Sequence, residues 1–379
     1  MTQPVEISFV ETADADAAAH QGRVALIVTP GGKLPPGLPR PARDAAMRAL
    51  DSKAGKALKP GGSLELAFPA GMAADALHLI ALPPKATAQE ARKAGAAIGA
   101  KLGKVHTLVL AGGHAQAADI ALGIALRGYD FSVYQTKPDG DDTASGDVNP
   151  AQLITTPGAH DDARMAEGEG TAPAEPGDAN PPQPEKARVT FAAKDPEALA
   201  RAARDGAALA EGVFFTRDLV NEPANVLTTS DFADRLQAME EIGLTVEVLD
   251  EDELAKLGMR ALLAVGQGSE SPSKVVVMRW NGGGDEPPLA LVGKGVVFDT
   301  GGISIKPAAG MEEMTMDMGG AGVVAGVMRT LALRRARANV VGLVGLVENM
   351  PDGRAQRPGD IVRSMKGDTI EVINTDAEG

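Results

Sequence analysis

Four carboxylates and two lysines stand in glycine-rich motifs toward the C-terminal end of the chain. Carboxylates a few ångströms apart repel one another unless a proton or a cation lies between them. Hard oxygen ligands suit Mg²⁺ and Mn²⁺, and Zn²⁺ also accepts carboxylates. This composition predicts a hydrolytic site for two metal ions. The motifs read Gly293-Lys294-Gly295-Val296-Val297-Phe298-Asp299-Thr300-Gly301-Gly302, Met316-Asp317-Met318-Gly319-Gly320 and Asn374-Thr375-Asp376-Ala377-Glu378-Gly379, with Lys306 between the first two.

The ligand types narrow the chemistry further. The five histidines all precede residue 161, and the chain has no cysteine, so a site among these motifs depends on oxygen ligands and lysine. Two metal ions about 3.5–4 Å apart hold a bridging hydroxide and polarise a carbonyl group. The expected chemistry is therefore hydrolysis by a hydroxide bound to two metals.

Local sequence indicates how these side chains converge. Asp376 and Glu378 follow the β-rich run Thr369–Ile373, and in an extended chain residues two apart face the same side. Asp299 ends an apolar segment, and the glycines after it permit a tight turn. Asp317 lies between two methionines, so its burial requires a partner.

The C-terminal half alternates apolar runs with helical patterns, which predicts an α/β fold with the carboxylates at strand ends. Ligands bind at that edge in open α/β sheets. Asp195-Pro196-Glu197 is a helix start, with an N-cap residue, a first-turn proline and a first-turn acid. The predicted helices run from Asp195 to about Leu219, from Ser230 to Gly243 and over Val323–Leu333. The predicted strands are Thr245–Leu249, Ala261–Val265, Lys274–Arg279, Leu289–Val292, Asn339–Leu346 and Thr369–Ile373.

The N-terminal half shows the same alternation, which predicts a second α/β layer with a largely parallel sheet. Its clearest helix is Ala88–Leu102, where Thr87 and Glu90 form a capping-box signature. The predicted strands are Val5–Val10, Arg23–Val28, Leu77–Leu82, His106–Leu110 and Phe131–Tyr134, and another follows at Ala187–Phe191.

The amino-acid composition changes over a central segment and divides the chain into three parts. Residues 137–186 are rich in Asp, Gly, Pro, Ala and Thr and hold few large apolar residues, so they cannot bury enough surface to offset their ordering entropy. We expect a disordered insertion or linker there; an acidic partner-binding segment is the alternative. The predicted organisation is an N-terminal α/β domain over 1–136, this linker, and a metal-binding catalytic domain over 187–379.

Charge and hydropathy exclude several classes of protein. The net charge of −14 argues against a nucleic-acid partner, since no basic stripe is present. No secretory signal is visible at the N-terminus, and the apolar stretch 340–347 is too short to cross a bilayer. We therefore expect a cytoplasmic location without membrane contact.

Taken together, the motifs closely resemble the leucyl aminopeptidase family, also called cytosol aminopeptidases. The string Asn374-Thr375-Asp376-Ala377-Glu378-Gly379 is that family's signature. The resemblance extends over 188–379 through Arg217-Asp218-Leu219-Val220-Asn221, Glu348-Asn349-Met350 and Arg357-Pro358-Gly359-Asp360, and residues 1–135 loosely resemble the family's macro-domain-like N-terminal domain. The resemblance implies a zinc-exopeptidase-like catalytic domain.

The resemblance also implies roles. Lys294, Asp299, Asp317 and Glu378 would bind one metal ion, and Asp299, Asp376 and Glu378 the other, with Mn²⁺ or Zn²⁺ as the ions. Lys306 would stay charged and stabilise the oxyanion. The implied substrates are peptides, from which N-terminal residues are released with a leucine-type preference. The family typically forms homohexamers.

Two departures from the family pattern concern the end of the sequence. The family's signature continues with an arginine that holds a bicarbonate, thought to act as general base, and its catalytic domain continues further. The sequence ends at Gly379. We therefore expect a C-terminally incomplete catalytic domain, with bicarbonate as a further cofactor whose arginine is missing. A catalytically impaired fragment, or a regulatory or binding protein on the same scaffold, stays open as the alternative.

Two other enzyme classes share part of the pattern. The Asp299-Thr300-Gly301 motif is also found in aspartic proteases, but a pepsin-like enzyme is all-β and this half is predicted to be α/β. A phosphate or nucleotide enzyme could use the same loop, but the sequence does not contain the P-loop pattern Gly-x-x-x-x-Gly-Lys-Ser/Thr that would support this reading.

Overall fold

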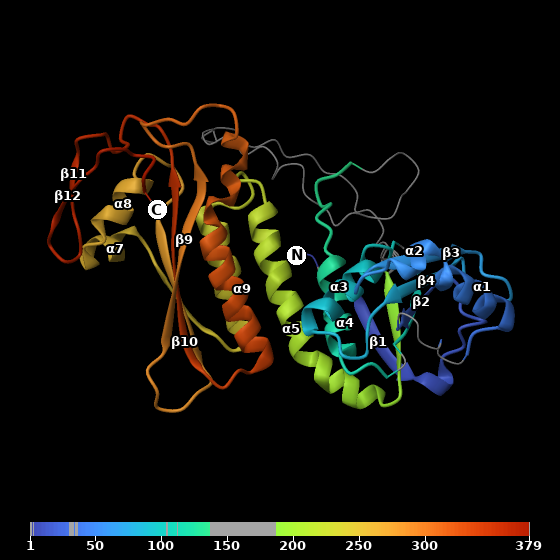
Figure 1. Ribbon diagram of the computed structural model, residues 1–379. Coiled ribbons are helices and arrows are strands. Elements are labelled where there is room, and N and C mark those ends of the chain that lie inside the picture. Colours follow the sequence, from blue (N-terminus) through green and yellow to red (C-terminus); the bar gives the residue numbers. More distant parts are fainter. Residues whose placement is uncertain are drawn as a thin grey trace, which may run out of the picture. The chain divides into compact units, whose positions relative to one another are not determined.

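A mixed α/β architecture with two main sheets confirms the predicted fold class (Figure 1). The computed structural model describes residues 2, 4–29, 34, 37–103, 105–111, 113–136 and 187–378. The expected linker, 137–186, lies outside these residues. The division into domains at 136 and 187 stays a prediction.

The first sheet contains six strands in the order β1-β6-β5-β2-β4-β3. Its neighbouring strands are parallel except for β3 and β4, so the expectation of a largely parallel sheet is confirmed. The strands are β1 (Glu6–Glu11), β2 (Arg23–Val28), β3 (Ser63–Ala67), β4 (Ala76–Ala81), β5 (Thr107–Leu110) and β6 (Arg188–Ala193).

Both faces of this sheet are covered, which explains why its inner strands β2, β4 and β5 are buried along nearly their whole length. Helices α3 (Ala88–Gly99) and α4 (Ala117–Arg127) pack their apolar residues on one face. Helix α1 (Arg40–Asp51) lies on the other face; the short α2 (Lys53–Lys56) and η1 (Thr12–Asp14) complete this half. The predicted capping box between Thr87 and Glu90 is present at the start of α3.

The predicted strand over Phe131–Tyr134 is wrong. These residues form coil and a turn after α4. Strand β5 already has a neighbour on each side, because β2 pairs with one edge and β6 with the other. Strand β6, which follows the expected linker in the sequence, therefore occupies the position beside β5 that a strand at 131–134 would need. The first sheet thus contains strands from before and after that linker.

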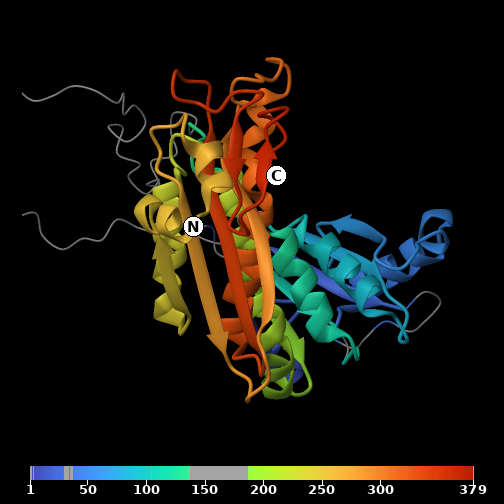
Figure 2. The same ribbon diagram turned by 90° about the vertical axis from the view of Figure 1, so that its left-hand side faces the viewer.

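The second sheet carries the carboxylate motifs and has the order β7-β8-β10-β9. Figure 2 shows β8, β10 and β9 side by side. Strand β10 is antiparallel to β8 and parallel to β9, and β7 is antiparallel to β8. The strands are β7 (Thr245–Leu249), β8 (Lys274–Asn281), β9 (Leu289–Asp299) and β10 (Asn339–Asn349); β11 (Ile361–Arg363) and β12 (Thr369–Glu371) form a separate hairpin.

Alternation along β8 divides the core into two layers, because successive side chains of a strand face opposite sides. Val276 and Met278 join the main cluster under α5, α6 and α9, whereas Val275 and Val277 pack with α7 and α8. The sheet is therefore covered on both faces. These helices are α5 (Pro196–Asn221), α6 (Thr229–Gln237), α7 (Glu251–Leu257), α8 (Arg260–Gly266) and α9 (Gly319–Arg334), with the 3₁₀ segments η3 (Ala238–Ile242) and η4 (Met311–Met318).

The predicted strand at Ala261–Val265 is also wrong, since these residues lie in α8. A short apolar run does not distinguish a strand from a buried helical turn by periodicity. Leu262 and Leu263 pack, together with Val341 and Leu343 of β10, around the buried cluster of Leu254, Val275 and Val277. The predicted start of α5 is confirmed, because Asp195 accepts a hydrogen bond from the backbone N–H of Ala198.

Candidate metal centre

Asp299 is the last residue of β9 and is 2% exposed. Its two carboxylate oxygens have different surroundings. Oδ1 accepts hydrogen bonds from the backbone N–H of Gly301 at 2.8 Å and from Nδ2 of Asn349 at 2.9 Å. Oδ2 lies 2.8 Å from Nζ of Lys306. One oxygen is therefore fixed by the scaffold, and the other faces a charged group.

The turn after Asp299 requires the glycines that follow it. Gly301 and Gly302 have φ angles of +88° and +65°, which lie in the left-handed region that side chains disfavour. A Cβ atom on Gly302 would also stand 2.7 Å from Oδ1 of Asn349. The sequence expectation of a tight turn at these glycines is confirmed.

Lys294 joins two of the predicted ligands. Its Nζ lies 2.8 Å from the Asp317 carboxylate and 2.7 Å from Oε1 of Glu378. Burial lowers the pKa of Lys294, but the neighbouring carboxylates of Asp317 and Glu378 outweigh burial and leave the pKa above its ordinary value. Asp317 thus has the partner that its apolar sequence context required, and it lies in η4 rather than at a strand end.

Lys306 joins the other two carboxylates. Its Nζ contacts Oδ1 of Asp376 as well as Oδ2 of Asp299. Burial lowers the pKa of Lys306, but these two carboxylates together raise it above its ordinary value. The side chain is therefore a cation across the neutral pH range.

A turn, not an extended strand, presents Asp376 and Glu378, so the expected geometry was wrong although both carboxylates reach the site. Buried Thr375 fixes this turn. Its hydroxyl donates to the carbonyl of Gly301 at 2.6 Å and accepts from the N–H of Ser304 at 2.8 Å. The turn is thereby tied to the loop that follows Asp299.

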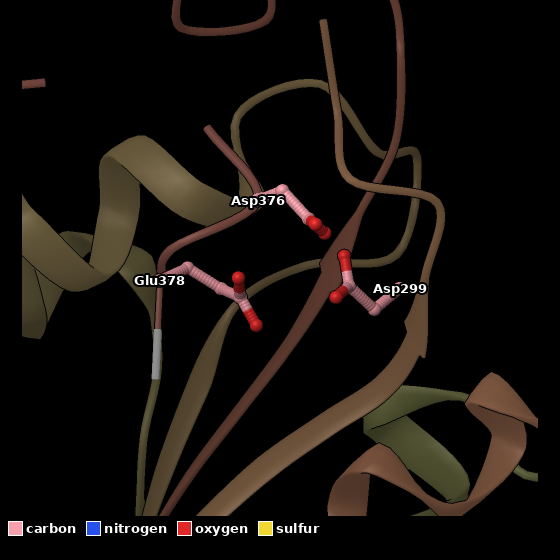
Figure 3. A group of neighbouring side chains, drawn as sticks. All are labelled: Asp299, Asp376 and Glu378. Atoms are coloured by element: carbon pink, nitrogen blue, oxygen red, sulfur yellow. The ribbon is translucent and has the colours of Figure 1, made fainter. Parts of the chain in front are cut away.

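The carboxylates of Asp299, Asp376 and Glu378 point toward a common space (Figure 3). One oxygen from each lies within 4.8 Å of the others. Lys294 links Glu378 of this group to Asp317, and Lys306 links Asp299 to Asp376, so the structure brings together the six residues that the sequence singled out. Four carboxylates outnumber two ammonium groups, and the excess negative charge favours cations.

The donor set fits divalent metal ions. Oδ2 of Asp317 and Oε1 of Glu378 are buried oxygens, and each forms an ion pair with Nζ of Lys294, at 2.8 and 2.7 Å. Buried carboxylates need a counter-charge, and divalent ions would supply more of it than the two lysines do. Lys294, Asp299, Asp317, Asp376 and Glu378 could hold such ions.

One groove lined by described residues lies apart from this centre. This groove of about 440 Å³ lies between α5 and α9, and its lining residues include Val323 and Val327 but none of the six residues of the cluster. The cluster, not this groove, holds the groups that could bind a metal.

Sequence reasoning missed Asn349 and Thr375 as parts of the centre. Both are buried polar residues beside predicted ligands, and their hydrogen bonds fix Asp299 and the turn before Asp376. Asn349 could have been found from the sequence. It is a polar residue at the end of an apolar strand, and such a residue is a candidate when other site residues also lie at strand ends.

Fold and cluster together define a mixed α/β protein with an acidic centre suited to divalent cations. Residues 214–379 match the model of the cytosol aminopeptidase family, catalytic domain. A probable cytosol aminopeptidase of Cereibacter sphaeroides is 56% identical over 384 residues, and one of Dinoroseobacter shibae is 56% identical over 383. Each match covers 100% of this chain and 69% of the relative.

A solved structure is similar over nearly the whole chain. The bottromycin maturation enzyme BotP in complex with Mn has a TM-score of 0.69 and 30% identity, over 96% of this chain and 66% of that one. The chain belongs to the cytosol aminopeptidase family, and it is thereby classed among the aminopeptidases, which are hydrolases. Among the described residues, no helix has the length and apolar character to span a membrane.

Proposed function

We propose that this chain supplies the metal centre of an aminopeptidase that binds two divalent ions. Lys294, Asp299, Asp317 and Glu378 would hold one ion, and Asp299, Asp376 and Glu378 the other. The observation that supports this most directly is the approach of Asp299, Asp376 and Glu378 oxygens to within 4.8 Å of one another. Ions bound there would supply Lewis-acid activation of water and of the substrate carbonyl.

Within this proposal the two lysines act differently. Lys306 lies between Asp299 and Asp376 and is held as a cation, so it would stabilise negative charge that develops on the carbonyl oxygen. The carboxylates of Asp317 and Glu378 likewise raise the pKa of Lys294. As a ligand it must lose its proton, which nearby divalent cations favour.

The proposed substrates are peptides with a free α-amino group and a leucine-type N-terminal residue. The family and the names of the relatives support the substrate class. The test compares hydrolysis of leucine p-nitroanilide with that of its N-acetyl form. The proposal expects release from the free amine alone, loss of that activity after chelation, and recovery with added metal. Equal release from the acetylated compound would contradict it.

The physiological ion is proposed to be Mn²⁺ or Zn²⁺. The solved relative was described in complex with Mn, and an oxygen-rich ligand set supports Mn²⁺. Reconstitution of the chelated protein with each ion, followed by kcat/KM, distinguishes them. The same assays with and without bicarbonate test whether this anion takes part.

Assembly and location complete the proposal. We infer a homohexamer in the cytoplasm, without nucleic-acid or membrane partners. The family supports the assembly, the names of the relatives support the location, and the net charge of −14 disfavours a nucleic-acid surface. Light scattering gives the oligomer mass; a monomeric protein would contradict the hexamer without affecting the proposed chemistry.

A further inference from the structure

Asn349 is a buried polar residue that the proposed reaction does not use. It ends β10, is 1% exposed, and pairs with Asp299 at the end of the parallel strand β9. The register shifts just before this pair: Val347 lies opposite Val296, but Asn349 lies opposite Asp299. Strand β9 therefore contains one extra residue, and this bulge places the Asn349 side chain beside the Asp299 carboxylate.

Both hydrogens of the Asn349 amide have partners in the centre. Nδ2 donates to Oδ1 of Asp299 at 2.9 Å and to the carbonyl of Thr375 at 3.0 Å. The backbone carbonyl of Asn349 accepts from the N–H of Thr300 at 3.0 Å and from its hydroxyl at 2.8 Å. One residue therefore joins the loop after Asp299 to the turn that carries Asp376.

These contacts determine which oxygen of Asp299 is available. Oδ1 accepts from Asn349 and from Gly301, whereas Oδ2 faces Lys306. The torsion that turns a carboxylate has broad minima, so an Asp side chain needs partners to hold one orientation. An amide suits this position because it donates two hydrogen bonds and adds no charge to an acidic cluster.

We propose that Asn349 is a positioning residue of the metal centre. It keeps Oδ1 of Asp299 bonded to the scaffold, so that Oδ2 would be the oxygen left for a metal ion, and it fixes the turn that presents Asp376 and Glu378. This inference rests on the proposed function, because it concerns the same centre. Groups that orient metal ligands typically change metal affinity by about 10–100-fold when they are removed.

The experiment measures Mn²⁺ binding to the protein and to an Asn349→Leu variant, which keeps the approximate shape and removes the amide. Free Mn²⁺ is counted by electron paramagnetic resonance. The matched control is Asn339→Leu at the opposite end of β10, whose amide nitrogen donates to the carbonyls of Gly284 and Glu286 and whose amide oxygen accepts from the N–H of Gly283, all outside the centre. We expect Asn349→Leu to weaken Mn²⁺ binding by about 10–100-fold, and Asn339→Leu to leave it unchanged.

Stability is followed separately, because both variants lose hydrogen bonds. The thermal midpoint of each metal-free protein gives this loss. A purely structural role for Asn349 predicts a lower midpoint with unchanged Mn²⁺ affinity, and that result would overturn the inference. If Asn349→Leu does not fold, Asn349→Ser replaces it, and the same loss of affinity is expected.

The two proposals fail in different ways. Tight Mn²⁺ binding by both the parent protein and the Asn349 variant overturns the positioning role and leaves the proposed function intact. Absence of Mn²⁺ and Zn²⁺ binding by the parent protein overturns the proposed function, and the inference with it.

Discussion

Lys294 and Lys306 are identical side chains for which we propose different roles. Each lies between two carboxylates, and in each case these acids outweigh burial and raise the lysine pKa. Their partners differ. Lys306 contacts Asp299 and Asp376, whereas Lys294 contacts Asp317 and Glu378. Lys294 therefore lies beside the two proposed ligands that Lys306 does not contact.

Replacing Lys306 should slow the reaction without removing the metals. We expect Lys306→Met to lower kcat by about 10²–10³-fold, the typical effect of removing one donor to a developing oxyanion. Metal content should be unchanged, because Lys306 is not among the proposed ligands. Steady-state kinetics and elemental analysis of the same preparation check this. Loss of metal together with activity would show that Lys306 holds the centre instead.

Metal binding should depend on pH through Lys294. The raised pKa means that the lysine is protonated near neutral pH, and a ligand lysine must lose that proton. Affinity should therefore rise with pH below this pKa, by about tenfold per unit for one released proton. Mn²⁺ binding measured between pH 6.5 and 8.5 tests this. The slope should decrease in Lys294→Gln; an equal slope in both proteins would assign the released proton to another group.

At the scale of elements, the bulge in β9 and the turn after it position the centre. One extra residue in β9 moves Asp299 opposite Asn349, and left-handed glycines then reverse the chain. The hydroxyl of Thr375 donates a hydrogen bond to the carbonyl of Gly301, so the turn before Asp376 is tied to the turn after Asp299. The proposed ligands are therefore held by backbone geometry as well as by their own contacts.

Gly302→Ala should disrupt this turn, and Gly310→Ala serves as its matched control. Both glycines have positive φ, but a Cβ atom on Gly310 meets nothing within 4 Å, whereas one on Gly302 meets Asn349. We expect a loss of about 1–2 kcal/mol in the free energy of unfolding for Gly310→Ala, from backbone strain alone. Gly302→Ala should lose about 1–3 kcal/mol more from overpacking. Urea denaturation measures both; equal losses would show that the close contact relaxes freely.

Element prediction succeeded where local signals were strong. The N-cap at Asp195 and the capping box at Thr87 both begin helices, because side chain and backbone satisfy each other within one turn. It failed for 131–134 and 261–265, where apolar residues alone indicated strands. The outcome there depended on distant partners: β6 fills the position beside β5, and α8 covers β10.

At the scale of the whole molecule, metal binding should stabilise the folded chain. The five proposed ligands span residues 294–378 and come from β9, η4 and the turn after β12, so they converge only in the folded state. A ligand that binds the folded state alone adds about 2.7 kcal/mol at a concentration one hundred times its Kd.

Thermal unfolding with and without Mn²⁺ tests this coupling. The midpoint should rise with added Mn²⁺ and fall on chelation, and Asp299→Ala should remove most of the rise, because Asp299 is shared by both proposed sites. A variant that keeps the full rise would place the bound ion outside this cluster.

Residue types and short spacings were enough to predict the α/β class, the family and six side chains that the structure gathers into one cluster. The three-dimensional structure was needed to show that β6 completes the first sheet, that a bulge aligns Asn349 with Asp299, and which carboxylates each lysine contacts. The difference lies in the separation of the interacting residues along the chain. Strand order, register and ion pairing join residues far apart in sequence, and their energies depend on the packing of the whole sheet rather than on any local pattern.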